Sequence, residues 1–477
     1  MKFISRFIAI ALLACMCVIA SAQSRQQLKT DSVFKLVKAR INDKDAAGLY
    51  ALMGSKYKSV IHSQTLRDIM ERDMFPYGQI KSDSLISFIN NNQAMYNVQF
   101  DAITYHLIMI LDETDKIQTL VFQPARNKPT IKNYKVPTSN PMVSAMDKLV
   151  DSLARLYIQK SNTVGLNIGI IKDGKTSIYS YGETARGNKN LPDNNTIFEL
   201  GSITKTFTAT LLAYYVNQGK ISLNDPIIKF LPPTVAANTA LANIKLVNLS
   251  NHTSGLPGIP DNFSLQRPYD QGNPYQNYNR QLLFDYLAKC SLNSKPGEKY
   301  QYSNMAVGLL GVILEKVSGK SFEQMVSEII TKPLGMKSTV QHLYPMIASR
   351  FAQVYDSDGN ITQAWDFDAL ASAGSLRSSI GDMLLYAKAN MNTKGTGPLY
   401  KAINLTHQIT LNNDARVGLG WHISIINGVD YYYHSGGTGG SSSFIALNPV
   451  KNLAVVILSN ADESTDNLGV DLVKKLQ

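Results

Sequence analysis

Ser202 and Lys205 stand three residues apart in the stretch FELGSITKTFTATLLAYYVNQGK, which turns from small residues into an apolar, helix-like run. Residues three apart share one face of a helix, so the hydroxyl and the amine would be neighbours. A neutral amine beside a serine can act as the base that makes the hydroxyl a nucleophile. At the reference lysine pKa of about 10.4, keeping the amine neutral at pH 7 costs roughly 4.6 kcal/mol. Burial lowers a lysine pKa, and we expect apolar neighbours to bury Lys205: Phe207, Leu211 and Leu212.

A Ser-x-x-Lys pattern is weak evidence by itself, because this chain repeats it at Ser32 and Ser55. Ser202 taken alone fits an ordinary helix cap equally well. Only further segments with matching chemistry would separate these two interpretations.

One such segment is KPGEKYQYSNMAVGLLGVIL, where a Pro-Gly turn leads to Tyr302, Ser303 and Asn304 and then into an apolar helix. A phenol and a carboxamide on a loop that feeds a helix can both point into a cleft. A capping Asn304 and a half-buried tyrosine would fit the same residues.

A second segment, His434-Ser435-Gly436-Gly437, ends a strand at the point where side chains are lost. Glycines there allow another backbone or a substrate to approach closely. The alternative is a loop that cradles phosphate, but the Lys-Ser/Thr pair that follows the glycines of such loops is missing.

In this order the three segments resemble the three boxes of the serine β-lactamase and penicillin-binding-protein superfamily. The Tyr-x-Asn form is similar to the branch of class C β-lactamases, D-alanyl-D-alanine carboxypeptidases and related esterases. The stretches SNHTSGLPGIP and SAGSLRSSIGDM are similar to family segments outside the boxes. The resemblance covers about residues 142–477.

The resemblance implies a role for each box. Ser202 would form an acyl-enzyme, and Lys205 would hold the serine and accept its proton. Tyr302 would be an alternative or cooperating base and would protonate the leaving group. Asn304 would bind the substrate amide and Lys205. The backbone N–H groups of Ser202 and Gly437 would form the oxyanion hole.

The third box departs from the pattern of many β-lactamases, which have a lysine where this chain has His434. Related peptidases and esterases often have histidine there, so efficient antibiotic hydrolysis is in doubt. We expect His434, with Ser435, Gly436 and Gly437, to bind the carboxylate or ester end of the substrate. At a reference pKa near 6.5, a histidine is about one quarter protonated at pH 7, so its attraction for a carboxylate should grow as the pH falls.

We predict no metal and no cofactor. The remaining histidines show no metal-ligand spacing and are expected to be packed or solvated: His62, His106, His252, His342, His407 and His422.

Two folded units are expected, because a chain of 477 residues is too long to form one compact hydrophobic core. In residues 23–124, apolar residues at helical spacing and paired strands around a turn at 112–116 predict a small α+β accessory domain. Its expected core positions are Phe34, Val37, Leu49 and Met53. Residues 125–141 are polar and contain three prolines, which predicts a linker.

The larger unit, residues 142–477, begins with a helix at 142–159 and a hairpin that turns at Asp173-Gly174. A helical, loop-rich middle follows, and then a hairpin around Asn448-Pro449 and a helix at 468–476. Strands at both ends predict that the chain returns to complete one antiparallel sheet. The predicted fold class is α+β, with an antiparallel sheet flanked by helices and a helical subdomain.

Residues 1–22 carry the pattern of a signal peptide: Lys2 and Arg6, an apolar run, and the cleavage pattern Ala20-Ser21-Ala22. The run is too short to span a bilayer, so a secreted or periplasmic protein without stable membrane insertion is expected. A lipoprotein cleavage box ending at Cys15 is the alternative. After cleavage only Cys290 would remain, which excludes a disulfide framework. The net charge is +11, but the sequence has no dense run of Lys and Arg and no nucleic-acid-binding motif.

These observations predict a secreted serine hydrolase that acts on peptides or amides ending in D-amino acids, as in cell-wall peptides, or on related β-lactams. A small-ester hydrolase is one alternative. A binding protein of another class, which is acylated by β-lactams or wall peptides without turnover and reports occupancy, is the second. Steady ester turnover would favour an enzyme, and a single acylation without release would favour the sensor.

Overall fold

The computed structural model describes residues 25–477 except positions 60, 91, 102–103, 126–128 and 414. The predicted signal peptide therefore lies outside the described residues. The chain divides into two compact units, Met1–Asn127 and Lys128–Gln477. Each unit is described by itself.

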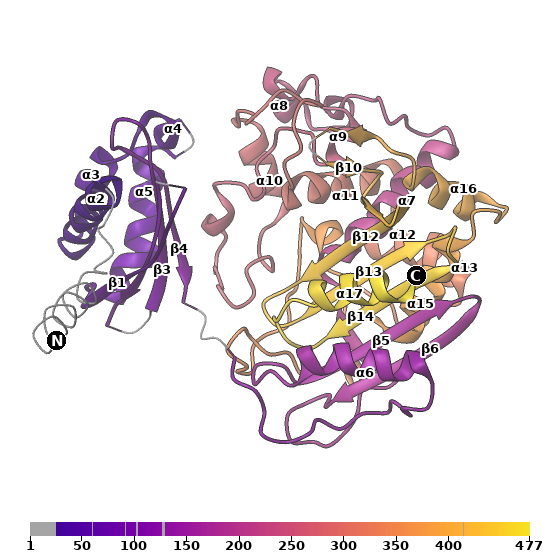
Figure 1. Cartoon of the computed structure of the whole chain (residues 1–477). Helices are drawn as coiled ribbons and strands as arrows, with labels where there is room; N and C mark the ends of the chain where they lie inside the picture. The colour runs from indigo at the N-terminus through magenta and orange to yellow at the C-terminus, as the bar shows by residue number, and fades with distance from the viewer. Residues whose placement is uncertain (1–24, 60, 91, 102–103, 126–128, 414) are drawn as a thin grey trace, which may run out of the picture. The chain divides into compact units, whose positions relative to one another are not determined.

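The smaller unit is a four-stranded antiparallel sheet packed against helices (Figure 1). Its helices are α2 (Arg25–Asn42), α3 (Ala46–Ala51), α4 (Ser55–Lys58) and α5 (Ser63–Ile69), and its strands, in sheet order, are β1 (Ser82–Ile89), β2 (Gln93–Gln99), β3 (Thr104–Leu111) and β4 (Ile117–Pro124). The strands β2 and β3 alternate buried and half-buried residues, so the sheet buries one face against the helices.

The four core positions expected in this unit are buried: Phe34, Val37, Leu49 and Met53. Phe34 of α2 stacks on Tyr96 of β2 with ring centroids 3.8 Å apart. The predicted turn between β3 and β4 is also present, because Asp112 N donates to Lys116 O at 2.8 Å. The predicted α+β class of this unit is confirmed.

Residues 129–141, in the segment predicted as a linker, are packed on the larger unit. Lys132 Nζ donates to the Ile158 and Thr163 carbonyls at 2.7 and 2.8 Å. Val136 is 2 % exposed, and Ser139 N donates to Ser180 O at 2.9 Å. Polar, proline-containing sequence is typical both of free linkers and of extended chain that lies along a domain, and composition does not separate the two.

The larger unit is built on an eight-stranded antiparallel sheet. Its strand order is β6 (Lys175–Gly182), β5 (Gly165–Lys172), β14 (Leu453–Ser459), β13 (Ser442–Asn448), β12 (Val429–Gly437), β11 (His422–Ile426), β10 (Arg416–Val417) and β9 (Leu411–Asn412). The last long strand pairs with the first, with Val456 opposite Gly169. The chain therefore returns to complete one sheet, as the two terminal hairpins predicted.

Helices cover both faces of this sheet (Figure 1). Successive residues of β14 belong to different apolar clusters: Val455 packs with residues of α6 (Ala145–Ile158) and α17 (Asp466–Leu476), and Val456 packs with residues of α15 (Ile380–Met391). Since both faces are covered, β13 and β14 consist of buried residues.

A helical region occupies the middle of the chain, as expected. Its helices are α7 (Thr204–Asn217), α8 (Pro233–Ala236), α9 (Leu246–Ser250), α10 (Arg280–Leu287), α11 (Asn304–Ser318), α12 (Phe322–Val326), α13 (Lys332–Leu334), α14 (Pro345–Ala348) and α16 (Pro398–Thr406). A two-stranded ladder of β7 (Ile197–Glu199) and β8 (Arg377–Ser379) leads into α7 and α15. Among the described helices, none combines the length and hydropathy that a membrane-crossing helix needs.

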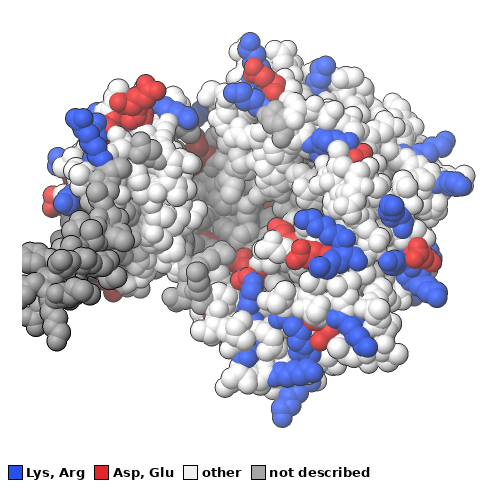
Figure 2. Space-filling view, in the orientation of Figure 1, with Lys and Arg blue, Asp and Glu red and all other residues white. Residues whose placement is uncertain are grey.

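On the face shown in Figure 2, Lys and Arg side chains lie singly or in small groups among acidic and uncharged residues. No continuous basic stripe is visible there.

Candidate active site

Ser202 lies in a single 3₁₀ turn, Gly201–Ile203, between β7 and α7. The end of β12 packs against this turn. Gly201 has φ +50°, and a Cβ at this position would lie 2.7 Å from the backbone N and O atoms of Gly437. A Cβ on Gly436 would collide with the Leu200 carbonyl. Glycine at both positions lets the two backbones touch, as the glycine pattern predicted.

Lys205, on the first turn of α7, is 1 % exposed. Its Nζ lies 2.9 Å from Ser202 Oγ and 2.6 Å from the carbonyl oxygen of Ala373. The ring centroid of Tyr302 lies 4.9 Å from the same nitrogen. Burial lowers the pKa of Lys205 well below its usual value, as expected.

One of the residues expected to bury the amine, Phe207, is not placed to do so. Phe207 is directed elsewhere and stacks on Tyr386 of α15, with ring centroids 4.1 Å apart. Two residues along a helix are about 200° apart around its axis, so Phe207 and Lys205 face different sides. The Tyr302 ring and the segment at Ala373 shield the amine instead.

Tyr302 lies on the loop before α11, and the residue is 36 % exposed. Burial of its phenol raises the pKa of Tyr302, an effect that an interaction with the Ser202 side chain only partly offsets. The phenol therefore keeps its proton at neutral pH.

Asn304 is the first residue of α11, and Ser303 is the N-cap, with its Oγ accepting from Ala306 N at 2.9 Å. Asn304 Nδ2 donates to Tyr275 OH at 3.0 Å. Its buried Oδ1 has no hydrogen-bond partner among the described residues. The hydrogen bonds of the described residues do not include the contact between Asn304 and Lys205 that the resemblance implied.

His434, on β12, is 2 % exposed, and its Nδ1 lies 2.6 Å from the Ser435 carbonyl oxygen. A carbonyl oxygen only accepts, so Nδ1 carries the proton and Nε2 carries a lone pair. Burial lowers the pKa of His434 well below 6.5, with further lowering from His422 and Lys205. The partial positive charge expected at pH 7 is therefore wrong, because the imidazole is shielded from water and lies among other basic groups.

The predicted residues thus come together around Ser202. Lys205 and His434 are buried, whereas Ser202 and Tyr302 are partly accessible and Gly437 is exposed. His434 was expected to contact the substrate, but its side chain is buried.

Two histidines at this site were missed as functional candidates. The ring centroids of His252 and His422 lie 4.4 and 6.5 Å from that of Tyr302. His422 also lies 5.1 Å from His434 by ring centroids, and burial lowers its pKa to about 4. His252 falls in the family-like stretch SNHTSGLPGIP, which was a usable signal. For His422 the only signal would have been its pairing opposite Tyr433 on β12.

A buried carboxylate, Glu199, was also missed. It accepts from Thr438 Oγ1 and from Trp365 N, each at 2.7 Å, and lies 4.0 Å from Arg377 Nη2. Burial raises the pKa of Glu199, and these contacts offset that rise only in part. Glu199 ends the strand before Ser202, and Thr438 follows Gly437, so this bond ties the two backbones together at the site.

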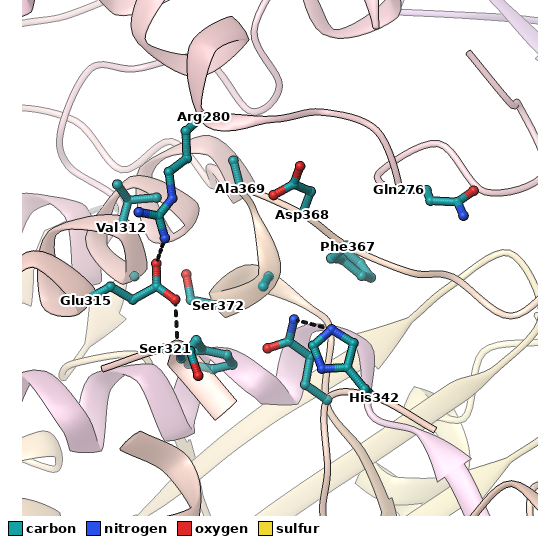
Figure 3. Close-up of a pocket in the computed structure, with 14 residues that line it drawn as sticks. Gln276, Arg280, Val312, Glu315, Ser321, His342, Phe367, Asp368, Ala369 and Ser372 are labelled. Carbon is teal, nitrogen blue, oxygen red and sulfur yellow. Dashed lines mark hydrogen bonds and ion pairs between the residues drawn. The ribbon is translucent and has the colours of Figure 1, made fainter. Parts of the chain in front are cut away.

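A separate pocket of about 300 Å³ lies beside the 3₁₀ turn Ala371–Ala373 (Figure 3). Arg280 and Glu315 face each other on its wall. Neither Ser202 nor Lys205 lines it. The described residues include no group of three or more His, Cys, Asp or Glu side chains placed to hold a metal ion.

Comparisons with known proteins show what this chain is similar to. A model of the Beta-lactamase family matches residues 147–476. A Beta-lactamase from Pseudomonas fluorescens is 29% identical over 346 residues, which cover 66% of this chain and 93% of that protein. The D-alanyl-D-alanine-carboxypeptidase/endopeptidase AmpH from Escherichia coli K12 is 30% identical over 332 residues, which cover 65% and 83%.

Among solved structures, a beta-lactamase/D-alanine carboxypeptidase from Pseudomonas syringae matches with a TM-score of 0.62 and 25% identity. The match covers 70% of this chain and 100% of that one. The smaller N-terminal unit lies outside the residues that the family model matches.

Proposed function

This chain belongs to the beta-lactamase family and is a serine hydrolase, and from that premise we propose that it works through an acyl-enzyme formed on Ser202. The observation that carries the proposal is the 2.9 Å contact between Ser202 Oγ and the buried amine of Lys205.

In the proposed reaction, Lys205 is the base. Its lowered pKa favours the neutral amine, which takes the proton from Ser202 Oγ as that oxygen attacks the substrate carbonyl. The ammonium formed in this step is stabilised by the Ala373 carbonyl and by the face of the Tyr302 ring.

Tyr302 is the proton donor for the leaving group, because its raised pKa keeps the phenol protonated. When the bond to the leaving group breaks, the phenol proton passes to the departing atom, and the Lys205 ammonium then returns a proton to Tyr302. A water molecule attacks the acyl group by the same route in reverse, which releases the acid and restores Ser202.

The backbone N–H groups of Ser202 and Gly437 are the proposed oxyanion hole. The close approach of Gly201 to Gly437 supports this assignment, because it brings the end of β12 to the turn that carries Ser202. The bond between Glu199 and Thr438 would hold that approach in place.

The proposed substrates are peptides or amides that end in a D-amino acid, or related β-lactams. The name of the Escherichia coli relative, a D-alanyl-D-alanine-carboxypeptidase/endopeptidase, supports this class. Asn304 Oδ1, which is buried without a partner among the described residues, would accept a hydrogen bond from the substrate amide N–H.

A small-ester hydrolase is the second candidate, and the state of His434 favours it. A buried, neutral imidazole offers no positive charge to a free carboxylate, whereas an ester needs none. We also propose that the protein is exported, with residues 1–22 as its signal peptide. Nucleic acid is not among its proposed partners.

The test is steady-state turnover of three substrates: a D-Ala-D-Ala peptide, benzylpenicillin and a p-nitrophenyl ester. Release of D-Ala supports the peptidase, and turnover of the ester alone supports the esterase. One equivalent of acylation without release supports the sensor. Ser202→Ala must abolish every one of these reactions, and turnover that survives this change would contradict the proposal.

A further inference from the structure

His252 holds the chain on both sides of Tyr302. Its carbonyl oxygen accepts from Gln301 N at 2.8 Å, and its ring Nδ1 accepts from Ser303 N at 3.2 Å. Its ring also lies against the Tyr302 ring, with centroids 4.4 Å apart. One residue therefore contacts the backbone before the tyrosine, the backbone after it and the aromatic ring itself.

The hydrogen bonds fix the state of this imidazole. A backbone N–H only donates, so His252 Nδ1 must be the unprotonated nitrogen and Nε2 carries the hydrogen. The residue is 1 % exposed. Burial, with Lys205 and His422 nearby, lowers the pKa of His252 well below 6.5 and so favours this neutral form.

The backbone of His252 is unusual as well. Its φ is +61°, in the left-handed region that residues with a side chain seldom adopt. The next residue, Thr253, accepts from Gly297 N at 2.7 Å through its carbonyl and from Asn248 Nδ2 at 2.9 Å through its hydroxyl. The turn that carries His252 is thus anchored independently of Tyr302.

We propose that His252 is a positioning residue that clamps the Tyr302 loop so that the phenol stays at Ser202. This inference rests on the proposed role of Tyr302. Tyr302 is 36 % exposed, so packing alone does not fix its ring. A displacement of about 1 Å at a reacting group can lower a rate about 100-fold.

The clamp acts on the rate of the chemical step rather than on substrate affinity, because the group that His252 contacts, Tyr302, is the proposed proton donor for the leaving group. Removing its side chain should lower kcat and leave KM nearly unchanged. His252→Gly is the cleanest change, since glycine adopts a positive φ without strain.

His252→Asn is the conservative variant. Asparagine tolerates a positive φ, and its Oδ1 can accept the Ser303 N–H in place of Nδ1. The matched control is His407→Asn: His407 is also a buried histidine against a tyrosine ring, with centroids 4.2 Å from Tyr432, and lies outside the clamp.

The experiment measures kcat and KM for D-Ala release from a D-Ala-D-Ala peptide by the full chain. We expect His252→Gly to lower kcat about 10- to 100-fold, His252→Asn to restore most of that loss, and His407→Asn to change little. In a Tyr302→Phe background, neither change at His252 should lower kcat further, because the group that it positions is already gone.

If His252→Gly lowers kcat by the same factor in the unmodified protein and in Tyr302→Phe, its role is merely structural and the clamp is overturned. A normal kcat in His252→Gly, with a large loss in Tyr302→Phe, would overturn the clamp alone. A normal kcat in Tyr302→Phe would overturn the proposed role of Tyr302 and the clamp with it. If His252→Gly does not fold by circular dichroism, the cycle is run with His252→Phe, which keeps an aromatic ring but offers no acceptor to the Ser303 N–H, and it decides by the same criterion.

If the unmodified protein releases no D-Ala, the proposed peptide substrate is wrong. The cycle is then run on a methyl ester, whose alkoxide leaving group, unlike a phenolate, is basic enough to need a proton as it departs. The clamp is supported if His252→Gly lowers kcat for this ester only when Tyr302 is present. It is overturned if the losses in kcat from His252→Gly and Tyr302→Phe are additive.

Discussion

Lys205 Nζ lies 2.9 Å from Ser202 Oγ, and the lysine is only 1 % exposed. At that distance a proton passes directly between the two groups, and burial favours the neutral amine that can receive it. The carbonyl of Ala373 holds the amine from the other side at 2.6 Å.

Lys205→Arg should lower the rate of Ser202 acylation by about 10²- to 10⁴-fold, because a guanidinium keeps its proton and cannot act as a base. The rate is measured as the pre-steady-state burst with a p-nitrophenyl ester. Lys172→Arg is the control, since its Nζ also bonds a backbone carbonyl, that of Leu476 at 2.6 Å, but on the far strand β5. A burst of normal rate in Lys205→Arg would exclude this lysine as the base.

Tyr302→Phe should separate substrates by their leaving group. A peptide amide needs a proton to depart, so its hydrolysis should fall about 100-fold, whereas release of p-nitrophenolate should change less than about threefold. Tyr300→Phe, at a half-buried tyrosine two residues earlier, is the control for local packing. Equal losses for both substrates would mean that Tyr302 acts on Ser202 rather than on the leaving group.

His434 should give no pH dependence of carboxylate binding between pH 6 and 8. Its folded pKa is depressed well below 6.5, so the imidazole is neutral throughout this range and gains charge only at more acid pH. The KM of a D-Ala-D-Ala peptide should therefore match the pH profile of the KM of its C-terminal amide. A KM that rises from pH 6 to 8 for the free carboxylate alone would show that His434 titrates there.

Two truncations should differ in stability. A chain that begins at residue 129 should keep its acylation rate and melting temperature. It still contains the residues around Ser202 and residues 129–141, which pack on the larger unit. A chain that begins at residue 142 loses the bonds of Lys132 to two carbonyls and the burial of Val136, and should melt several degrees lower. Equal melting temperatures by calorimetry would show that residues 129–141 contribute nothing.

The fold was predictable where local signals agree. The hairpin at Asp173-Gly174 and that at Asn448-Pro449 lie at the two ends of the larger unit, and their pairing through β5 and β14 completed the sheet as expected. The Ser202–Lys205 contact was predictable too, because helix geometry alone brings residues three apart together.

The surroundings of those residues were not predictable, because they come from distant parts of the chain. The bond between Thr438 and Glu199 joins residues 239 positions apart, and Ala373 is 168 positions from Lys205. The charge of His434 was misjudged for the same reason: its pKa depends on burial and on His422 and Lys205, which lie on other elements. Strand periodicity places a residue on a face of the sheet but does not show what packs against it.

The central claim, that Ser202 carries the acyl group, is tested most directly by intact-mass analysis of the full chain during reaction with a p-nitrophenyl ester, quenched within the burst, followed by peptide mapping. We predict a single added acyl mass on the peptide that contains Ser202, and no added mass in Ser202→Ala. An acyl group mapped to another residue, or an adduct that persists in Ser202→Ala, would contradict the account.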